Sequence, residues 1–345
     1  MLIMNFDEYK NKGLTGLANL GNTCYLNSCI QIFSHTYELN ELFKKIAQQR
    51  NLNNVIDSVL LIEWNKLYTL MWKENCTIAP YGFLKAIQNV STKKQHYLFS
   101  GFEQNDMPEF LFFLLDCFHN GLEREVDIKI SGVPQNNSDK IAKLCYKMIQ
   151  DMYSKSYSEL LDLFYGIQVS QICNLKKEIK SLTPEPFSML NLSIPNNIIN
   201  PSIIDCFDLY CKEELLQGEN SWFNEDTKQK EEVSKNYCFW SLPEILIIDL
   251  KRFTNTNKKI HTIVDVPLNN LDLSKYIIGY NKKNCLYNLY AICNHTGSVL
   301  GGHYFAYIKT ASDKWMVFND TIVKEVPENK LITEKSYCFF FRKIK

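Results

Sequence analysis

The stretch GLANLGNTCYLNS, residues 16–28, carries the strongest structural signal in the sequence. Gly21 and Asn22 tolerate the backbone angles of a sharp turn, and apolar residues then repeat at helical spacing from Leu26 to Phe33. The pattern predicts an amphipathic helix with Cys24 in its first turn. The free N–H groups and the positive dipole end at such a position favour a thiolate, although a cysteine at a helix start is, taken alone, more often structural.

The expected partner residues of Cys24 come from the late part of the sequence. His303 follows two glycines, and the segments 303–309 and 315–318 have the aromatic and β-branched composition of strands. Residues 310–312 between them suit a three-residue hairpin loop. The sequence therefore predicts a β-hairpin that presents His303 on one of its strands.

The register of this hairpin would place two polar side chains together. If Lys309 pairs with Asp313, His303 lies directly opposite Asn319, with Cβ atoms about 4.5–5.5 Å apart. At that distance the amide oxygen of Asn319 can accept a hydrogen bond from one imidazole nitrogen, and the other nitrogen can face a thiol. A slip of one residue would turn either side chain to the other face. Taken alone, the hairpin could equally carry an ordinary surface histidine.

Composition excludes several classes of protein. The 345 residues suffice for two or more lobes or one large mixed domain. The 38 basic and 38 acidic residues give no net charge, which argues against a broad basic surface for nucleic acid, and the apolar runs are too short to cross a bilayer. We therefore expect no nucleic-acid and no membrane partner. Scattered cysteines without a Cys-x-x-Cys pair, and an N-terminus unlike a signal peptide, predict a reduced intracellular protein of the cytoplasm, with the nucleus as an open alternative.

The order of helical and strand patterns predicts an α+β fold. Helical spacing occurs within residues 38–90, after Asp106 and again over residues 140–163. Strand patterns begin with the continuous apolar run 245–248, which is typical of a strand buried on both faces, and continue to 337–342. A loop or lobe junction is expected over residues 120–139, and a solvated hairpin tip or loop over residues 218–235. Helices first and an antiparallel sheet later is an α+β layout.

Several motifs, in their order along the chain, resemble those of the ubiquitin-specific proteases, a family of papain-like cysteine peptidases. The segment around Cys24 resembles the cysteine box of that family. The other matching segments are a glutamine-aspartate box at 102–110, a palm strand at 242–253, histidine boxes at 287–304 and 315–320, and a closing strand at 337–341. The resemblance covers residues 13–342, and chance does not readily produce so dense an ordered set.

The resemblance implies a papain-like fold with thumb, palm and fingers subdomains. Residues 1–12 would be an N-terminal extension, and residues 13–345 would form the catalytic domain. Its expected parts are the thumb (about 13–125), a helical junction (about 126–164), the fingers (about 165–242) and the palm (about 243–345). The active site would lie between thumb and palm, and ubiquitin would rest on the fingers with its tail in the cleft.

The resemblance also implies catalytic roles for individual residues. Cys24 would be the nucleophile, His303 the general base and Asn319 the third member of the triad. Asn19 would donate a hydrogen bond to the oxyanion of the tetrahedral intermediate, and Asp320 would assist from beside Asn319. Asn19 has an alternative interpretation as a turn residue that caps its own backbone.

Ubiquitin has a basic tail that ends in two glycines, so the resemblance implies a narrow channel with carboxylates beside it. Asp106 resembles the tail-binding acid of the family, with Gln104 and Glu109 in the same segment, and Tyr304 would line the glycine channel. Each acid also suits the start of a helix, and Tyr304 also suits packing within a strand. Residues 295–302 would form a loop that moves when ubiquitin enters.

One departure from the family pattern concerns metal binding. Many members hold a structural zinc in the fingers with two Cys-x-x-Cys pairs. Here Cys173 is followed by Lys176 at the second ligand position, and the other pair falls near Asn224 and Thr227. One thiolate cannot hold a tetrahedral zinc, so we expect no metal and no other cofactor.

These observations predict a deubiquitinating cysteine protease that cleaves the bond after the C-terminal glycine of ubiquitin through a thioester intermediate. Its partners would be ubiquitin and ubiquitin-conjugated proteins. One alternative is a catalytically silent ubiquitin-binding module, against which the intact Cys24, His303 and Asn319 argue. The other is a protease for a different ubiquitin-like modifier, which the tail-binding acids leave open.

Overall fold

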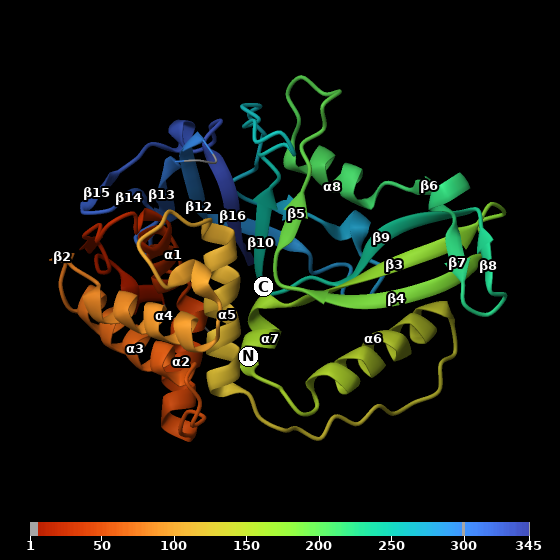
Figure 1. Cartoon of the computed structure of the whole chain (residues 1–345), viewed down its shortest axis with the longest axis horizontal. Coiled ribbons are helices and arrows are strands. Elements are labelled where there is room, and N and C mark those ends of the chain that lie inside the picture. Colours follow the sequence, from red (N-terminus) through yellow and green to blue (C-terminus); the bar gives the residue numbers. More distant parts are fainter. Residues whose placement is uncertain (1–5, 299–300, 345) are drawn as a thin grey trace.

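The first part of the chain forms a helical lobe (Figure 1). The structure is a computed structural model that describes residues 6–298 and 301–344. The helices of the lobe are α1 (Cys24–Ser34), α2 (Tyr37–Gln49), α3 (Ser58–Lys73), α4 (Tyr81–Lys93) and α5 (Met107–Leu122). Shorter elements are the 3-10 helices η1 (Phe6–Tyr9) and η2 (Tyr97–Phe99) and the parallel strands β1 (Gly16–Leu17) and β2 (Thr77–Ile78). The helices expected within residues 38–90 and after Asp106 are thus confirmed.

The late part of the chain forms a large sheet, as the strand patterns predict. The strand order is β15-β14-β13-β12-β16-β10-β5, with β11 paired to β12. The β10–β5 pair is parallel and the other pairs are antiparallel. The strands are β5 (Leu190–Leu192), β10 (Ile245–Leu250), β11 (Leu271–Asp272), β12 (Leu286–Ser298), β13 (Gly301–Lys309), β14 (Trp315–Asn319), β15 (Ile322–Glu325) and β16 (Ser336–Lys343).

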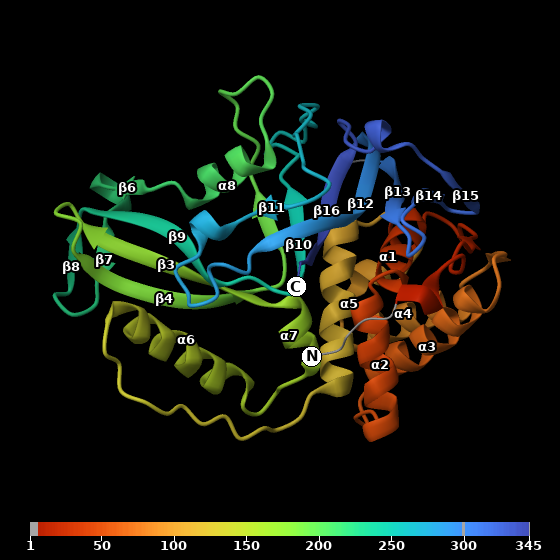
Figure 2. The same cartoon turned by 180° about the vertical axis from the view of Figure 1, so that it is seen from behind.

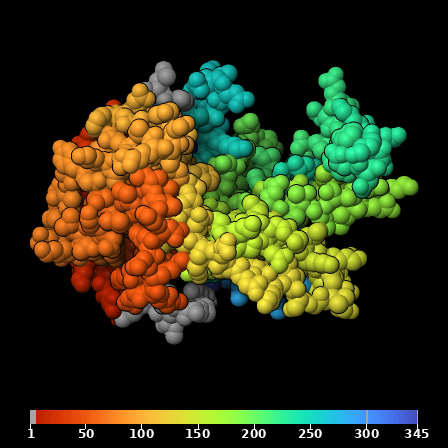
Figure 3. All heavy atoms as spheres, turned by 60° about the horizontal axis from the view of Figure 1, so that its bottom comes forward, coloured from red at the N-terminus to blue at the C-terminus, as the bar shows by residue number. Residues whose placement is uncertain are grey.

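A second sheet extends away from the helical lobe (Figures 1 and 2). Its order is β4-β3-β9-β6, and a separate β7–β8 hairpin lies at its tip. The strands are β3 (Gly166–Asn174), β4 (Ile179–Phe187), β6 (Glu214–Leu216), β7 (Trp222–Asn224), β8 (Gln229–Glu231) and β9 (Val233–Ser241). Helices α6 (Asn137–Tyr153) and α8 (Ile203–Cys211) contact this sheet, whereas α7 (Glu159–Phe164) contacts α2, α5 and β10. Figure 3 shows the yellow segment that contains α6 on the underside of this extension.

Two main hydrophobic cores lie on opposite faces of the large sheet. In β10, Ile245 and Ile247 pack into the core shared with the helical lobe, whereas Leu246 and Ile248 pack into the core on the side of α8. All of β10 is buried, as its continuous apolar run predicts. Helix α1 is buried along its whole length because it packs between α5 and β13. Helix α1 is thereby held against the β12–β14 part of the large sheet.

The predicted register of the β13–β14 hairpin is wrong by two positions. Lys309 pairs with Trp315 instead of Asp313. The loop has three residues, as predicted, but they are 311–313. The N–H of Thr310 donates to the carbonyl of Lys314 at 2.9 Å and closes this loop, in which Asp313 adopts the left-handed conformation (φ 59°). A turn closed by a left-handed residue is a common form of three-residue hairpin.

This correction leaves the faces of the two strands unchanged. Because side chains alternate with a period of two, a shift of two positions keeps His303 and Asn319 on the same face. The β13–β14 pairing extends to Ala306 and Phe318, so His303 lies beyond the paired part of the hairpin. The two side chains meet near the open end of the hairpin, rather than as directly paired residues.

Two further segments differ from prediction. The helical pattern over residues 140–163 is divided into α6 and α7, because residues 154–158 leave the helix and Tyr157 pairs with Arg124 in an isolated bridge. The expected moving loop, residues 295–302, is largely strand: 295–298 end β12 and 301–302 begin β13. Residues 299–300 lie outside the described residues.

Three remaining sequence-based expectations concern the N-terminal extension, membrane-spanning helices and the cysteines. Of the predicted extension, residues 6–9 form η1 and Tyr9 packs against Tyr37 with ring centroids 4.4 Å apart, while residues 1–5 lie outside the described residues. No helix within 6–298 and 301–344 combines the length and apolar character needed to cross a bilayer. The twelve cysteines, all of them described, are free.

Candidate active site

Cys24 is the first residue of α1, as its motif predicts. Gly21 and Asn22 both have positive φ angles, 101° and 57°, and the turn that they form is closed by Asn19. The side-chain oxygen of Asn19 accepts hydrogen bonds from the backbone N–H groups of Gly21 and Thr23, each at 3.1 Å. Cys24 is 4% exposed. The turn therefore holds a nearly buried thiol at the positive end of a helix.

The late part of the chain brings an imidazole to this thiol. His303 Nε2 donates to the side-chain oxygen of Asn319 at 2.6 Å, and the Cys24 side chain is the other partner of the ring. Contact with Cys24, the hydrogen bond to Asn319 and the negative charge of Asp320 raise the pKa of His303 to about 9, although burial alone would lower it. The ring is therefore suited to carry a proton beside the sulfur near neutral pH.

Asp320 connects the sheet to the loop before α1. Its carboxylate accepts from the side-chain amides of Asn19, at 3.1 Å, and Asn27, at 2.8 Å, and its carbonyl accepts from the N–H of Leu17 at 2.8 Å. Asn19 thus caps its own turn, as its alternative interpretation requires, while its amide nitrogen is held by Asp320. The sequence analysis did not single out Asn27, although a polar side chain in a fully buried helix was a usable signal.

The predicted tail-binding acids lie at the start of α5. Asp106 caps this helix by accepting from the N–H of Glu109 at 3.2 Å, and it also accepts from the hydroxyls of Tyr304, at 3.1 Å, and Tyr337, at 2.9 Å. Burial raises the pKa of Asp106, and these hydrogen bonds partly offset that rise. Glu109 is exposed on α5. The helix-capping interpretation is confirmed for Asp106, and the tyrosines join it to the large sheet.

Gln104 spans the gap between the helical lobe and the sheet. Its side-chain oxygen accepts from the N–H of Gly302 at 2.8 Å, and its nitrogen lies 3.5 Å from the side-chain oxygen of Asn22. Gln104 is exposed. Gln104 therefore contacts both Asn22, in the turn before Cys24, and Gly302, the residue before His303 in β13.

His295 is a residue that the sequence analysis placed in a mobile loop, and this interpretation is wrong. It lies in β12, 4% exposed, with its ring 4.7 Å from that of Tyr304. Lys259 donates to the carbonyl of His295 at 2.6 Å. Burial, with the charges of Lys259 and His303, lowers the pKa of His295 to about 4. Gly302 makes this packing possible, because a Cβ there would lie 2.1 Å from the His295 ring.

Asn224 and Thr227, which the resemblance aligns with one pair of zinc ligands, lie in a hydrogen-bonded turn. The side-chain oxygen of Asn224 accepts from the N–H groups of Asp226 and Thr227. Glu231 accepts from the Asn224 amide at 2.6 Å and from the Thr227 hydroxyl at 3.0 Å. Side-chain hydrogen bonds therefore organise the tip of the β7–β8 hairpin. The expectation that this region binds no metal stays a prediction.

Elsewhere in the described chain, one group of side chains has the spacing of metal ligands: Asp57, Asp116 and Cys117. Lys94 lies among them, with its ammonium 2.6 Å from Asp57 and 2.8 Å from Asp116. Because the ammonium group of Lys94 lies between the two carboxylates, where a metal ion would otherwise sit, the cluster is an internal ion pair network.

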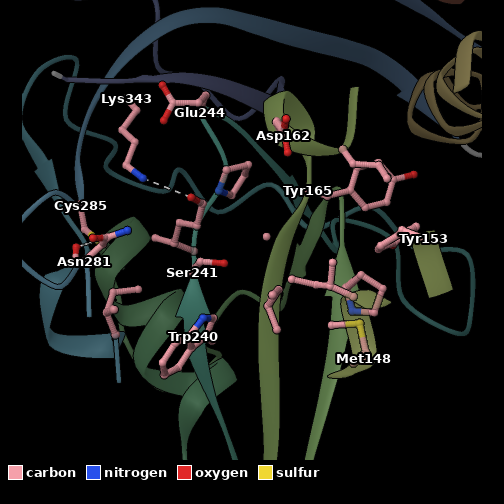
Figure 4. Close-up of a pocket in the computed structure, with 18 of the residues that line it drawn as sticks. Met148, Tyr153, Asp162, Tyr165, Trp240, Ser241, Glu244, Asn281, Cys285 and Lys343 are labelled. Carbon is pink, nitrogen blue, oxygen red and sulfur yellow. Dashed lines mark hydrogen bonds between the residues drawn. The ribbon is translucent and has the colours of Figure 1, made fainter. Parts of the chain in front are cut away.

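The cavity in Figure 4 is separate from these residues. It has a volume of about 320 Å³ and lies where α6 and α7 meet β3 and β9. Tyr153, Tyr165 and Trp240 contribute to its walls (Figure 4). Of the described residues that line it, none is a predicted site residue.

Comparison with known proteins identifies the relatives of this chain. The sequence model of a family described as "Ubiquitin carboxyl-terminal hydrolase" matches residues 15–341. Ubiquitin carboxyl-terminal hydrolase Usp2 of Drosophila melanogaster is 35% identical over 97% of this chain, which spans 35% of that protein. Human ubiquitin carboxyl-terminal hydrolase 2 is 31% identical over 96% of the chain, which spans 55% of it. The chain thus spans about a third to half the length of these relatives.

A solved structure shares the fold. A chain of the SAGA DUB module with Ubp8, bound to monoubiquitin, superposes with a TM-score of 0.74 at 20% identity, covering 100% of this chain and 72% of that one. This likeness confirms the predicted α+β, papain-like fold.

Proposed function

Because the chain belongs to the ubiquitin carboxyl-terminal hydrolase family, we propose that it is a thiol-dependent deubiquitinase. It hydrolyses the isopeptide or peptide bond after the C-terminal glycine of ubiquitin. The observation that carries the proposal is the line of three side chains, Cys24, His303 and Asn319, in which the imidazole contacts the thiol and donates to the amide oxygen at 2.6 Å. The fold alone would serve a binding module equally well, whereas this line has a chemical use.

The first half of the reaction forms a thioester. His303 takes the proton of the Cys24 thiol, and Asn319 holds the ring in the required orientation. The thiolate attacks the carbonyl carbon of the terminal glycine, and the tetrahedral intermediate then collapses as His303 gives its proton to the leaving amine. The raised pKa of His303 favours the protonated ring that this step needs.

The second half of the reaction restores the enzyme. Water adds to the thioester carbonyl while His303 accepts one of its protons. Collapse of this second intermediate releases the carboxylate of ubiquitin, and the sulfur of Cys24 regains its proton from His303. The reaction consumes one water, and none of its steps draws on a cofactor.

Asn19 supplies the oxyanion site together with the backbone N–H of Cys24. One hydrogen of the Asn19 amide is directed to Asp320 at 3.1 Å, and its second hydrogen is available to the intermediate. Asp320 therefore assists by fixing the donor and by adding negative charge near His303. The loss of one such donor typically reduces kcat by about a hundredfold or more.

Substrate binding follows from the same arrangement. Residues 13–125 serve as the thumb, 126–164 as the junction, 165–242 as the fingers and 243–345 as the palm, and the tail of ubiquitin lies between thumb and palm. Asp106 and Glu109 attract its basic residues, Tyr304 walls its glycines, and Gln104 must release Gly302 as the tail enters. We place this activity in the cytoplasm.

An electrophilic ubiquitin probe tests the proposal. Ubiquitin with a thiol-reactive group at its C-terminus should form a covalent adduct with the wild-type chain and none with Cys24→Ala. Cys29→Ala is the matched control, because Cys29 lies in the same helix but is fully buried, and burial raises the pKa of its thiol. Tight binding of the probe without an adduct would instead support a silent binding module. Probes built on other ubiquitin-like modifiers check the choice of modifier.

A further inference from the structure

Phe305 is an aromatic residue on the same strand as His303. It lies two positions after His303 in β13, so the two side chains share one face of the strand. Their ring centroids are 6.4 Å apart, and the ring planes are inclined by 23°. Phe305 is half-buried. The imidazole therefore has an aromatic ring as its neighbour along the strand.

The position of Phe305 also relates it to Asn319. Ala306 pairs with Phe318, so Phe305 and Asn319 are the next residues toward the open end of the hairpin and lie on the same face. The hydrogen bond from His303 Nε2 to the Asn319 oxygen, 2.6 Å long, runs diagonally across this face. Phe305 fills the corner between the two residues, on the side toward the paired part of the hairpin.

Phe305 is itself held by the rest of the sheet. Its ring meets that of Tyr307 edge to face, with centroids 5.4 Å apart and planes at 74°. Tyr307 in turn packs against the core on the side of α8. Opposite Phe305 in β12 lies Asn294, which is fully buried. The place of the Phe305 ring is therefore set from the core outward, through Tyr307.

On the outer side of the hydrogen bond the apolar cover is thin. Asn319 pairs there with Ile322 of β15, whose side chain is 53% exposed. Water that reaches the bond competes for the amide oxygen and for the imidazole N–H, and a hydrogen bond is weaker in water than in an apolar environment. A side chain that keeps water from the inner side therefore strengthens the contact that orients His303.

We infer that Phe305 is a positioning residue, whose ring shields the hydrogen bond between His303 and Asn319 from water and so holds the imidazole in the orientation that the thiol requires. The inference rests on the proposed function and adds to it a residue to which the sequence motifs assign no role. Phe305 makes no contact with the substrate in this scheme. Its replacement should therefore lower kcat and leave KM near the wild-type value.

Steady-state hydrolysis of ubiquitin carrying a fluorogenic amide measures this effect. Phe305→Leu keeps an apolar cover and should retain kcat within about twofold. Phe305→Thr keeps a side chain suited to a strand but admits water, and should lower kcat by roughly three- to tenfold, the effect of one weakened hydrogen bond. Met316→Ala is the matched control and should match the wild type, because Met316 lies on the other face of the same hairpin and packs against the core shared with the helical lobe.

A double-mutant cycle tests whether Phe305 acts through Asn319. If the ring works by shielding this hydrogen bond, Phe305→Thr should have little further effect on kcat once Asn319→Ala has removed the acceptor. If the two effects multiply, Phe305 acts by another route and the inference is wrong. Equal kcat in Phe305→Thr and the wild type would overturn it as well. If Phe305→Thr does not fold, Phe305→Val, which shortens the side chain without adding a polar group, takes its place in every arm.

A spectroscopic arm is independent of turnover. In the reduced wild-type chain, isotopically labelled at its histidine nitrogens, the Nε2 proton of His303 should give a downfield resonance that is absent from His303→Gln. The resonance should persist in Phe305→Leu and Met316→Ala and broaden through exchange with water in Phe305→Thr. An equally sharp resonance in Phe305→Thr would contradict the inference. This arm also separates the inference from the proposed function, because a wild-type chain without hydrolytic activity would refute the function while the resonance still reported on the shield.

Discussion

Replacing Asn319 by alanine removes the acceptor that orients His303. In the structure the amide oxygen lies 2.6 Å from Nε2 of a ring whose pKa is about 9. Hydrogen bonds to a charged partner contribute about 1.5–3 kcal/mol. If the whole contribution is made in the transition state, kcat falls by roughly 10- to 150-fold. Because the substrate does not contact this amide in the proposed mechanism, KM should stay near the wild-type value.

The pH profile gives a second readout of the same change. A pKa unit corresponds to about 1.4 kcal/mol, so losing this hydrogen bond should lower the pKa of His303 by about one to two units. The group must be protonated when the amine leaves, and activity therefore falls as the pH rises through this pKa. The alkaline limb of kcat/KM, which reports the free enzyme and is expected near pH 9 in the wild type, should move toward neutral pH in Asn319→Ala.

The assay is steady-state hydrolysis of ubiquitin carrying a fluorogenic amide, between pH 5.5 and 10. Asn319→Asp retains an acceptor and should keep most of the activity. Asn288→Ala serves as the folding control. Asn288 also accepts a hydrogen bond, from the N–H of Asn270, but it lies in β12, whereas Asn319 lies in β14. An unchanged kcat together with an unmoved alkaline limb in Asn319→Ala would remove Asn319 from the mechanism.

Three further predictions use other features. Gly302→Ala should reduce kcat, because the new Cβ would lie 2.1 Å from the His295 ring and force the start of β13 to shift beside His303. The control Gly101→Ala places a Cβ that meets nothing within 4 Å and should match the wild type. Equal rates in both variants would contradict the argument. Asp249→Asn should raise the free energy of unfolding at pH 8 more than at pH 4, because folding raises the pKa of this buried acid of β10. Such an acid destabilises the folded state progressively as the pH rises from its unfolded-state pKa toward its folded-state pKa. Urea denaturation at both pH values checks the sign. Metal analysis of the purified protein should find well under one zinc per chain, and stoichiometric zinc would refute the metal-free interpretation of the region around Asn224.

Local signals in the sequence accounted for much of the fold and part of the candidate site. The helix that begins at Cys24 and the doubly buried strand β10 follow from patterns within a dozen residues. The hairpin register was predicted wrongly, because it depends on which loop residue adopts the left-handed conformation. Aspartate tolerates that conformation better than Ser312 or Lys314, but the prediction did not use this difference at Asp313. A shift of two positions left His303 and Asn319 on one face, so their contact was predicted from a register that was wrong.

Contacts between distant segments were the least predictable. Asn27 donates to Asp320, which lies far away in the sequence. His295 packs against Tyr304 of the neighbouring strand β13. Their sequence surroundings gave no indication of those partners. Asp249 did leave a signal, an acid within an apolar run, but the sequence could not show that the negative charge of Asp106 helps to raise its pKa.

The hydrogen bond between Asn19 and Asp320 joins residues 301 positions apart in the sequence, and it has a consequence for biosynthesis. A ribosome delivers Cys24 well before His303, so the growing chain carries a thiol without its imidazole partner until β13 has been made. In the proposed mechanism, hydrolysis can begin only after β13 and β14 have emerged and docked against α1. A message truncated before β13 would yield a product without the proposed pair of Cys24 and His303.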